Sequence, residues 1–382
     1  MTKPRARDLG LAFQGQTGPY NSITDVPGVR VGYKTITRTA DNGRHVQTGV
    51  TAILPRGYEN EPQPVWAGFH ALNGNGEMTG THWIEDGGYF VGPVCLTNTH
   101  SVGIVHQAAT RWTIEHYAEA WKTNHLWAMP VVAETYDGVI NDINGLHINE
   151  ADALDALKSA VDGVIEEGNV GGGNGMICYG FKGGTGTSSR KIEVGGETFT
   201  LGVLVQANHG MRDWLQVLAV PVGRHFQDEL PEVLRRERGS IIVVIATDAP
   251  MLPHQLRRLA RRASLGIGRA GTPGGNNSGD IFLAFSVANP KPMPQLSGMR
   301  QSIDYLNDEF FDAFYLGAVE ATDEAVINAM LAAEDAPMQK PAGLCRALKG
   351  EELLDAMARA EGGSGRRSQV ASGQLPISAP QQ

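Results

Sequence analysis

The chain has 382 residues, of which 41% are hydrophobic and 19% charged, and its formal net charge is −9. This composition is that of a globular protein with enough chain for a large core. The acidic balance argues against a nucleic-acid-binding protein, which needs a basic face, and no apolar run approaches the roughly 18 residues of a membrane-spanning helix. The sequence therefore predicts neither nucleic acid nor a membrane as partner.

Two features bear on the cellular compartment. Residues 1–11 contain no apolar stretch of the kind that a secretory signal requires. The cysteines at 95, 178 and 345 lie far apart and form neither a CxxC motif nor an even disulfide framework. We therefore expect a reducing compartment, the cytoplasm.

The first half of the chain mixes predicted strands and helices. Residues 1–20 are expected to form an arm, followed by short strands within 21–33. Further strands are expected at 50–54, 66–70, 89–97 and 130–136. Apolar residues recur at helical spacing over 105–121 and 150–163.

The second half begins with a glycine-rich segment, 168–186, and a predicted hairpin with Gly195-Gly196 at its turn. The later elements are expected to be strands at 241–247 and 281–287, and helices at 253–266, 303–335 with a break, and 350–360. Residues 361–382 are rich in Gly, Ser, Gln and Pro and predict a disordered tail. The order lacks a regular βαβ rhythm, which favours an α+β fold with layered sheets and outer helices over 21–360.

The junction Gly239-Ser240 separates two unlike segments. Residues 228–238 are a charged run, whereas 241–247 (Ile-Ile-Val-Val-Ile-Ala-Thr) are typical of a strand buried on both faces. Gly-Ser alone is a common turn into a strand. If the peptide bond before Ser240 were cut, the serine would carry a free α-amine beside its hydroxyl, and such an amine can act as the base for that hydroxyl.

Residues 274–280 (Gly-Gly-Asn-Asn-Ser-Gly-Asp) lead into the predicted strand 281–287. Ser278 and Asp280 are two residues apart on extended chain and are therefore expected to point to the same face. A hydroxyl and a carboxylate there could hold the amine of an N-terminal nucleophile in position. The alternative is an ordinary turn, since these residues favour turns.

Two further strand ends carry polar side chains. Asn208 follows the apolar run 201–205 and could donate an amide N–H to an oxyanion, with an Asx turn as the structural alternative. At the end of 130–136, Tyr136 could donate a second such hydrogen bond, and Glu134 could pair with a substrate ammonium group. Each of these residue types is commonly structural when it occurs alone.

Other catalytic and binding motifs are incomplete. The glycine-rich stretches 171–175 and 183–189 lack Gly-Lys-Ser/Thr and a strand–GxGxxG–helix context, so they predict nucleotide binding only weakly. The scattered histidines show no metal-ligand spacing, and no GxSxG elbow marks a Ser-His-Asp triad. We therefore expect neither a metal nor a cofactor.

Residues 21–32, 134–137, 205–208, 239–250 and 277–280 together resemble the L-aminopeptidase/D-esterase and β-peptidyl aminopeptidase family. The resemblance covers about residues 5–360, in the family's order. It implies a four-layered αββα sandwich that resembles the N-terminal-nucleophile hydrolases, has a different connectivity, and is shared with ornithine acetyltransferases. It also implies a self-processing serine aminopeptidase with amidase and esterase activity.

The resemblance assigns roles to the matching residues of this chain. It implies a cut between Gly239 and Ser240, with Ser240 as the nucleophile. The remaining motif residues would serve the reacting groups: Ser278 and Asp280 would orient the amine and hydroxyl, Asn208 and Tyr136 would form the oxyanion hole, and Glu134 would hold the free amino group of the substrate. Gly239 and Asp280 are the residue types of the L-aminopeptidase/D-esterase branch.

The same resemblance implies an α chain (1–239) and a β chain (240–382) that stay together in a homotetramer of heterodimers. Its substrates would be small peptides, amides or esters with a free amino group. One alternative is an acyltransferase on the same fold, which passes the acyl group to an amine instead of water. The other is a non-enzymatic module that binds a nucleotide or metabolite with its glycine loops.

Overall fold

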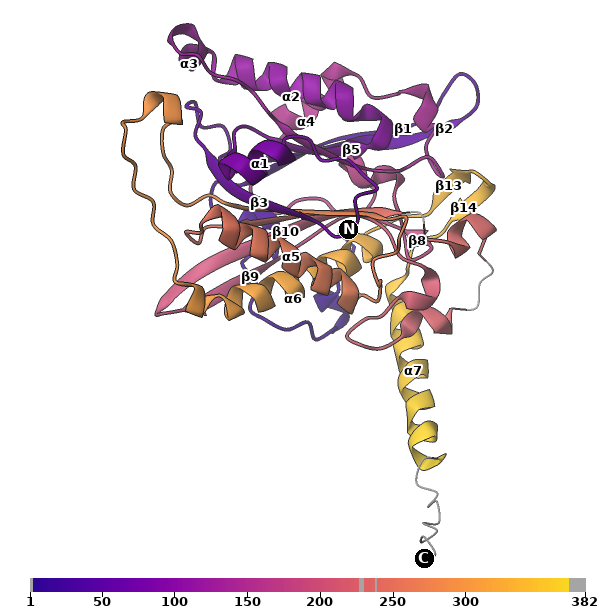
Figure 1. Ribbon diagram of the computed structural model, residues 1–382. Helices are drawn as coiled ribbons and strands as arrows, with labels where there is room; N and C mark the ends of the chain where they lie inside the picture. Colours follow the sequence, from indigo (N-terminus) through magenta and orange to yellow (C-terminus); the bar gives the residue numbers. More distant parts are fainter. Residues whose placement is uncertain (1–2, 227–229, 238, 371–382) are drawn as a thin grey trace, which may run out of the picture.

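The computed structural model describes residues 3–226, 230–237 and 239–370, and its two large sheets lie face to face (Figure 1). The four-stranded sheet has the order β1-β2-β5-β6. Its strands are β1 (Arg30–Thr39), β2 (His45–Leu54), β5 (Val94–Asn98) and β6 (Val131–Thr135). β5 and β6 run parallel, whereas the other pairs are antiparallel.

The six-stranded sheet has the order β4-β3-β12-β11-β10-β9. Its strands are β3 (Val65–Ala71), β4 (Tyr89–Phe90), β9 (Gly184–Val194), β10 (Glu197–Asn208), β11 (Ser240–Thr247) and β12 (Gly279–Ser286). β9 and β10 form the expected hairpin at Gly195-Gly196. β11 and β12 are parallel neighbours at the centre of this sheet.

Helices cover the outer face of each sheet (Figure 1). α2 (Val102–His116) and α4 (Glu150–Lys158) bury their apolar faces on the four-stranded sheet. α5 (Pro253–Arg269) and α6 (Asp312–Leu331) cover the six-stranded sheet. A separate apolar core fills the space between the two sheets. The expected αββα sandwich is therefore confirmed.

β11 shows why the sequence places a strand at the centre of the molecule. All its residues are buried. Ile241, Val243 and Ile245 face the α5/α6 layer, whereas Ile242 and Val244 face the other sheet. Because successive side chains of a strand point to opposite faces, only a continuous apolar run can satisfy both layers.

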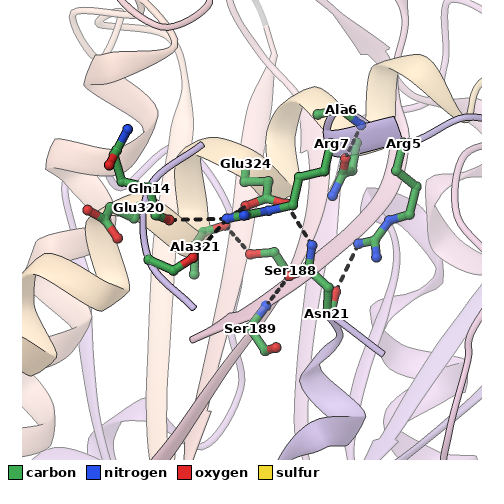
Figure 2. Close-up of polar contacts among 12 residues, drawn as sticks. Arg5, Ala6, Arg7, Gln14, Asn21, Ser188, Ser189, Glu320, Ala321 and Glu324 are labelled. Atoms are coloured by element: carbon green, nitrogen blue, oxygen red, sulfur yellow. Dashed lines mark hydrogen bonds and ion pairs between the residues drawn. The ribbon is translucent and has the colours of Figure 1, made fainter. Parts of the chain in front are cut away.

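The N-terminal segment packs onto the sandwich through a buried ion-pair cluster (Figure 2). Glu324 of α6 accepts hydrogen bonds from Arg190 of β9 at 2.8 Å, from Arg7 at 2.9 Å and from Asn21 at 2.6 Å. Burial acts to raise the pKa of Glu324, but the hydrogen bond from Arg7 and the charge of Arg190 outweigh it and lower that pKa. A buried carboxylate is tolerated because it is paired in this way.

The remaining elements lie at the edges of the sandwich. They are α1 (Thr81–Gly87), α3 (Ala118–Thr123), α7 (Gly350–Val370) and the short hairpins of β7 (Ile177–Cys178) with β8 (Phe181–Lys182) and β13 (Ala336–Gln339) with β14 (Ala342–Cys345). α7 projects from the body (Figure 1) and continues to Val370, so residues 361–370 are helical and not part of a disordered tail as expected. The rest of the expected tail, 371–382, lies outside the described residues. Within the described ranges, no helix is long and apolar enough to cross a membrane.

Several expected boundaries are wrong. The glycine-rich segment ends earlier than expected, because β9 already begins at Gly184. The expected strand 89–97 is divided between β4 and β5, which belong to different sheets. The helix expected over 303–335 is α6, which begins only at Asp312 and ends at Leu331. These boundaries depend on which sheet each residue joins, and a local pattern does not record that.

Candidate active site

The ends of three neighbouring strands meet at Ser240. Ser240 is the first residue of β11 and pairs with Asn208, the last residue of the antiparallel β10. On its other side Ser240 pairs with Gly279, the first residue of the parallel β12. This register brings together segments that lie more than thirty residues apart along the chain.

The Ser240 side chain is buried and fully engaged. Only 5% of the residue is exposed. Its Oγ donates to the carbonyl oxygen of Gly239 at 2.8 Å and accepts from the amide of Gly279 at 3.1 Å. The hydroxyl lies against the carbonyl group that self-cleavage would attack.

Glycine is required on both sides of this hydroxyl. A Cβ at Gly279 would lie 2.7 Å from the carbonyl carbon of Asn75 and 3.0 Å from Ser240 Oγ. A Cβ at Gly239 would overlap the carbonyl oxygen of Asn208 and lie 2.7 Å from its carbon. Both contacts are far closer than ordinary packing allows, so the backbones approach only because these residues have no side chain.

Ser278 and Asp280 form a buried pair, as their spacing predicts. Ser278 Oγ donates to Asp280 Oδ1 at 2.6 Å, and Asn73 Nδ2 donates to Asp280 Oδ2 at 3.2 Å. Burial raises the pKa of Asp280, and hydrogen bonds from Ser278, Asn73 and the main chain of Ile241 oppose this rise. The carboxylate thus reaches the backbone one residue after Ser240.

The pair does not lie on the same face as the Ser240 hydroxyl. Asp280 is in register with Ile241, whereas Gly279 is in register with Ser240. Because paired residues of parallel strands point to the same face, Asp280 lies on the α5/α6 side and the hydroxyl on the side of the other sheet. The structure therefore brings the pair to the main chain of β11 and gives it no hydrogen bond to Ser240 Oγ.

Asn208 and Tyr136 lie side by side at the open end of the site. Asn208 Nδ2 donates to the main-chain oxygen of Tyr136 at 3.0 Å, and Asn208 Oδ1 accepts from the Ile177 amide at 2.8 Å. These bonds fix the amide orientation and direct its NH₂ group toward Tyr136. Asn208 is buried, whereas Tyr136 is 40% exposed and its ring covers Gly138.

Glu134 lies at the end of β6, on the opposite sheet. Its carboxylate accepts from the amide of Glu77 at 2.9 Å and from the hydroxyl of Thr99. A Cβ at Gly76 would be 3.1 Å from Glu134 Oε1 and 3.5 Å from Gly279 Cα. Gly76 therefore lies between Glu134 and Gly279, the residue that pairs with Ser240. Burial raises the pKa of Glu134, and an arriving cation would lower it again.

A cavity of about 260 Å³ opens at the end of β10, and Ser240, Glu134, Ser278 and Asp280 are not among the described residues that line it. Tyr136, Asn208 and Gly239 form part of its wall. Its apolar lining comes from the side chains of Val139, Ile177, Val233 and Leu234. A small apolar side chain can therefore be accommodated next to the scissile bond.

Sequence reasoning missed the loop that connects the two sheets at this site. Asn73 contacts Asp280, and Asn75 Nδ2 donates to the main-chain oxygen of Asn277 at 2.6 Å. Thr79 then binds the main chain of Val132 on β6, two residues before Glu134. The available signal was the Asn-Gly-Asn-Gly run at 73–76, a polar turn directly after a strand.

The glycine-rich segment 171–175 is not a nucleotide loop. All five residues are buried. A Cβ at Gly173 would overlap the backbone of Thr185, so these glycines allow close packing between the sheets. In the part of the chain that the structure describes, no group of three or more His, Cys, Asp or Glu side chains has the arrangement of a metal site.

Comparison with known proteins identifies the family. The model of peptidase family S58 matches residues 21–342. The chain belongs to this family. It is 49% identical over 348 residues to β-peptidyl aminopeptidase BapA of Sphingosinicella microcystinivorans, an alignment that covers 87% of this chain and 86% of that protein. Members of family S58 in this comparison are aminopeptidases, and the chain is a self-processing serine aminopeptidase.

Solved structures agree with the fold. The L-aminopeptidase D-Ala-esterase/amidase of Ochrobactrum anthropi, described as a variant of the Ntn hydrolase fold, superposes with a TM-score of 0.90 at 57% identity, covering 94% of this chain and 99% of that one. A β-aminopeptidase of Burkholderia sp. superposes with a TM-score of 0.85 at 41% identity, covering 98% of this chain and all of the other. Neither comparison favours an acyltransferase or a binding module.

Proposed function

We propose that Ser240 performs both self-cleavage and peptide hydrolysis. The observation that carries the proposal is the position of its hydroxyl, 2.8 Å from the carbonyl oxygen of Gly239 and in register with Asn208. In self-cleavage, Ser240 Oγ bonds to the Gly239 carbonyl carbon, the peptide C–N bond breaks, and the hydroxyl proton ends on the released amine. Water then hydrolyses the ester, which leaves a carboxyl group on Gly239 and restores the hydroxyl.

In the mature enzyme the released amine of Ser240 would serve as the base for its own hydroxyl. The Ser278–Asp280 pair supports this role, because it contacts the main chain of β11 and not the hydroxyl. Asn208 and Tyr136 would stabilise the oxyanion, where one donor typically contributes about 3–4 kcal/mol. The acyl-enzyme on Ser240 would then be hydrolysed by water.

Glu134 would select substrates with a free amino group. Its buried carboxylate lies one glycine away from the strand end that carries Gly279, and a charge-assisted hydrogen bond to an ammonium group is among the stronger polar contacts. The substrates would then be small peptides, amides or esters cleaved at their first residue. The names of the relatives indicate β-peptides and D-alanine esters or amides as the substrate classes to test first.

We also propose that the two chains stay together and that the heterodimers form a homotetramer, as the family resemblance implies. The shared central sheet supports the first part, because β10 on the α side and β11 on the β side are paired along eight residues. Cys95, Cys178 and Cys345 are unpaired and buried, which supports a reducing, cytoplasmic compartment.

Mass spectrometry of the purified protein tests the proposal. By proportion of 40.9 kDa, the two chains should have masses of about 26 and about 15 kDa. Sequencing of the smaller chain should begin Ser-Ile-Ile-Val-Val, and Ser240→Ala should give a single uncut chain without peptidase activity. A wild-type chain that remains intact after long incubation would refute the proposal.

A further inference from the structure

Glu237, two residues before the cut, joins two main-chain amides with one carboxylate. Its Oε1 accepts from the amide of Gly239 at 2.9 Å, and its Oε2 accepts from the amide of Gly210 at 2.6 Å. Hydrogen bonds to an ionised carboxylate are about twice as strong as neutral ones. Both oxygens are thus committed to fixing backbone.

One of these amides belongs to the residue that would be cut, and the other lies beside the residue that would stabilise the oxyanion. Gly239 carries the carbonyl group that Ser240 would attack. Gly210 follows β10 two residues after Asn208, the proposed oxyanion donor. Glu237 therefore ties the scissile residue to the strand end that carries its donor.

The surroundings of Glu237 are shaped to hold it. A Cβ at Gly275 would lie 3.1 Å from Glu237 Cβ and would overlap its Cγ. Gly210 has a φ of +88°, which favours glycine and turns its amide toward the carboxylate. Gly275 thus leaves room for the Glu237 side chain, and Gly210 and Gly239 supply the two amides that it accepts from.

We propose that Glu237 is a positioning residue for self-cleavage, an inference that rests on the proposed role of Ser240. The carboxylate holds residue 239 so that its carbonyl group stays against Ser240 Oγ, beside the end of β10 that carries Asn208. Attack on a carbonyl group is sensitive to this alignment, since a misplacement of about 1 Å can cost roughly a hundredfold in rate. Glu237 makes no covalent bond and transfers no proton in this role.

The test compares Glu237→Gln with Glu232→Gln during self-cleavage of freshly synthesised chain. Glutamine keeps the shape but has one acceptor oxygen, so it can hold one amide and not both. Glu232 lies in the same segment with its side chain 80% exposed, and it forms an ion pair with Arg236 at 3.4 Å. Rates are measured by gel at a temperature where circular dichroism shows every variant folded.

We expect Glu237→Gln to slow self-cleavage by roughly tenfold or more, and Glu232→Gln to cleave at the wild-type rate. Hydroxylamine, which cleaves an ester but not the peptide, should not restore the rate, because Glu237 acts before the ester forms. Wild-type cleavage of Glu237→Gln, or full rescue by hydroxylamine, would overturn the inference. Failure of the wild-type chain to cut would instead refute the proposed function.

Discussion

Gly239→Ala offers a sharp test of the site geometry. The added Cβ would overlap the carbonyl oxygen of Asn208 and lie 2.7 Å from its carbonyl carbon and 2.9 Å from Cα of His209. All three atoms are backbone, and the pairing of Asn208 with Ser240 holds them in place. Residue 239, rather than its neighbours, must therefore move.

The size of the effect follows from this overlap. Ordinary contacts of a Cβ are about 3.4–4 Å, so residue 239 must shift by an ångström or more, and a shift of this size costs roughly a hundredfold in a reaction that depends on alignment. Overpacking adds a loss of about 1–3 kcal/mol in the free energy of unfolding. A time course on a denaturing gel should therefore show cleavage slowed by roughly a hundredfold or more, in a chain that is still folded.

Gly268→Ala is the matched control. A Cβ at this glycine of α5 would meet no atom within 4 Å, so self-cleavage should be unchanged while the helix gains up to about 1 kcal/mol. If Gly239→Ala cut itself as fast as the control, the backbone of residue 239 would not be confined as described, and the reasoning would be wrong.

Two further predictions concern charged groups. Glu134→Gln should reduce kcat/KM for free-amine substrates by roughly tenfold to a hundredfold, mainly through KM, since a hydrogen bond to a charged group contributes about 1.5–3 kcal/mol. Self-cleavage of Glu134→Gln should be unaffected, and the exposed control Glu232→Gln should keep the wild-type KM. An unchanged KM in Glu134→Gln would contradict amine binding by this residue. Burial raises the pKa of Asp323 in α6 from 3.8 to about 7, so stability is lost as pH rises through this range, by up to roughly 4 kcal/mol. In the uncut Ser240→Ala background, Asp323→Asn should thus stabilise the chain at about pH 8 and much less at about pH 4.5. Urea unfolding measures the difference in free energy of unfolding between this variant and Ser240→Ala, and an equal difference at both pH values would refute the prediction.

Local sequence patterns were sufficient for the elements that carry the chemistry. The β-branched run 241–247 predicts a strand buried on both faces, because no other structure accommodates alternate apolar residues on two sides. The spacing of Ser278 and Asp280 predicts their contact for the same reason of alternation. Motif order then identified the family, since Gly-Ser before such a strand and Ser-Gly-Asp before the next occur together in it.

Only the tertiary structure decided how these elements meet. The register that places Asn208 opposite Ser240, the approach of Glu134 from the other sheet, and the bond of Glu237 to Gly210 all join residues distant in the chain. The structure also put the Ser278–Asp280 pair on the face of the sheet opposite the hydroxyl. A local pattern records the period of a strand and its two faces, whereas register and the contacts of loops depend on how whole sheets pack against one another.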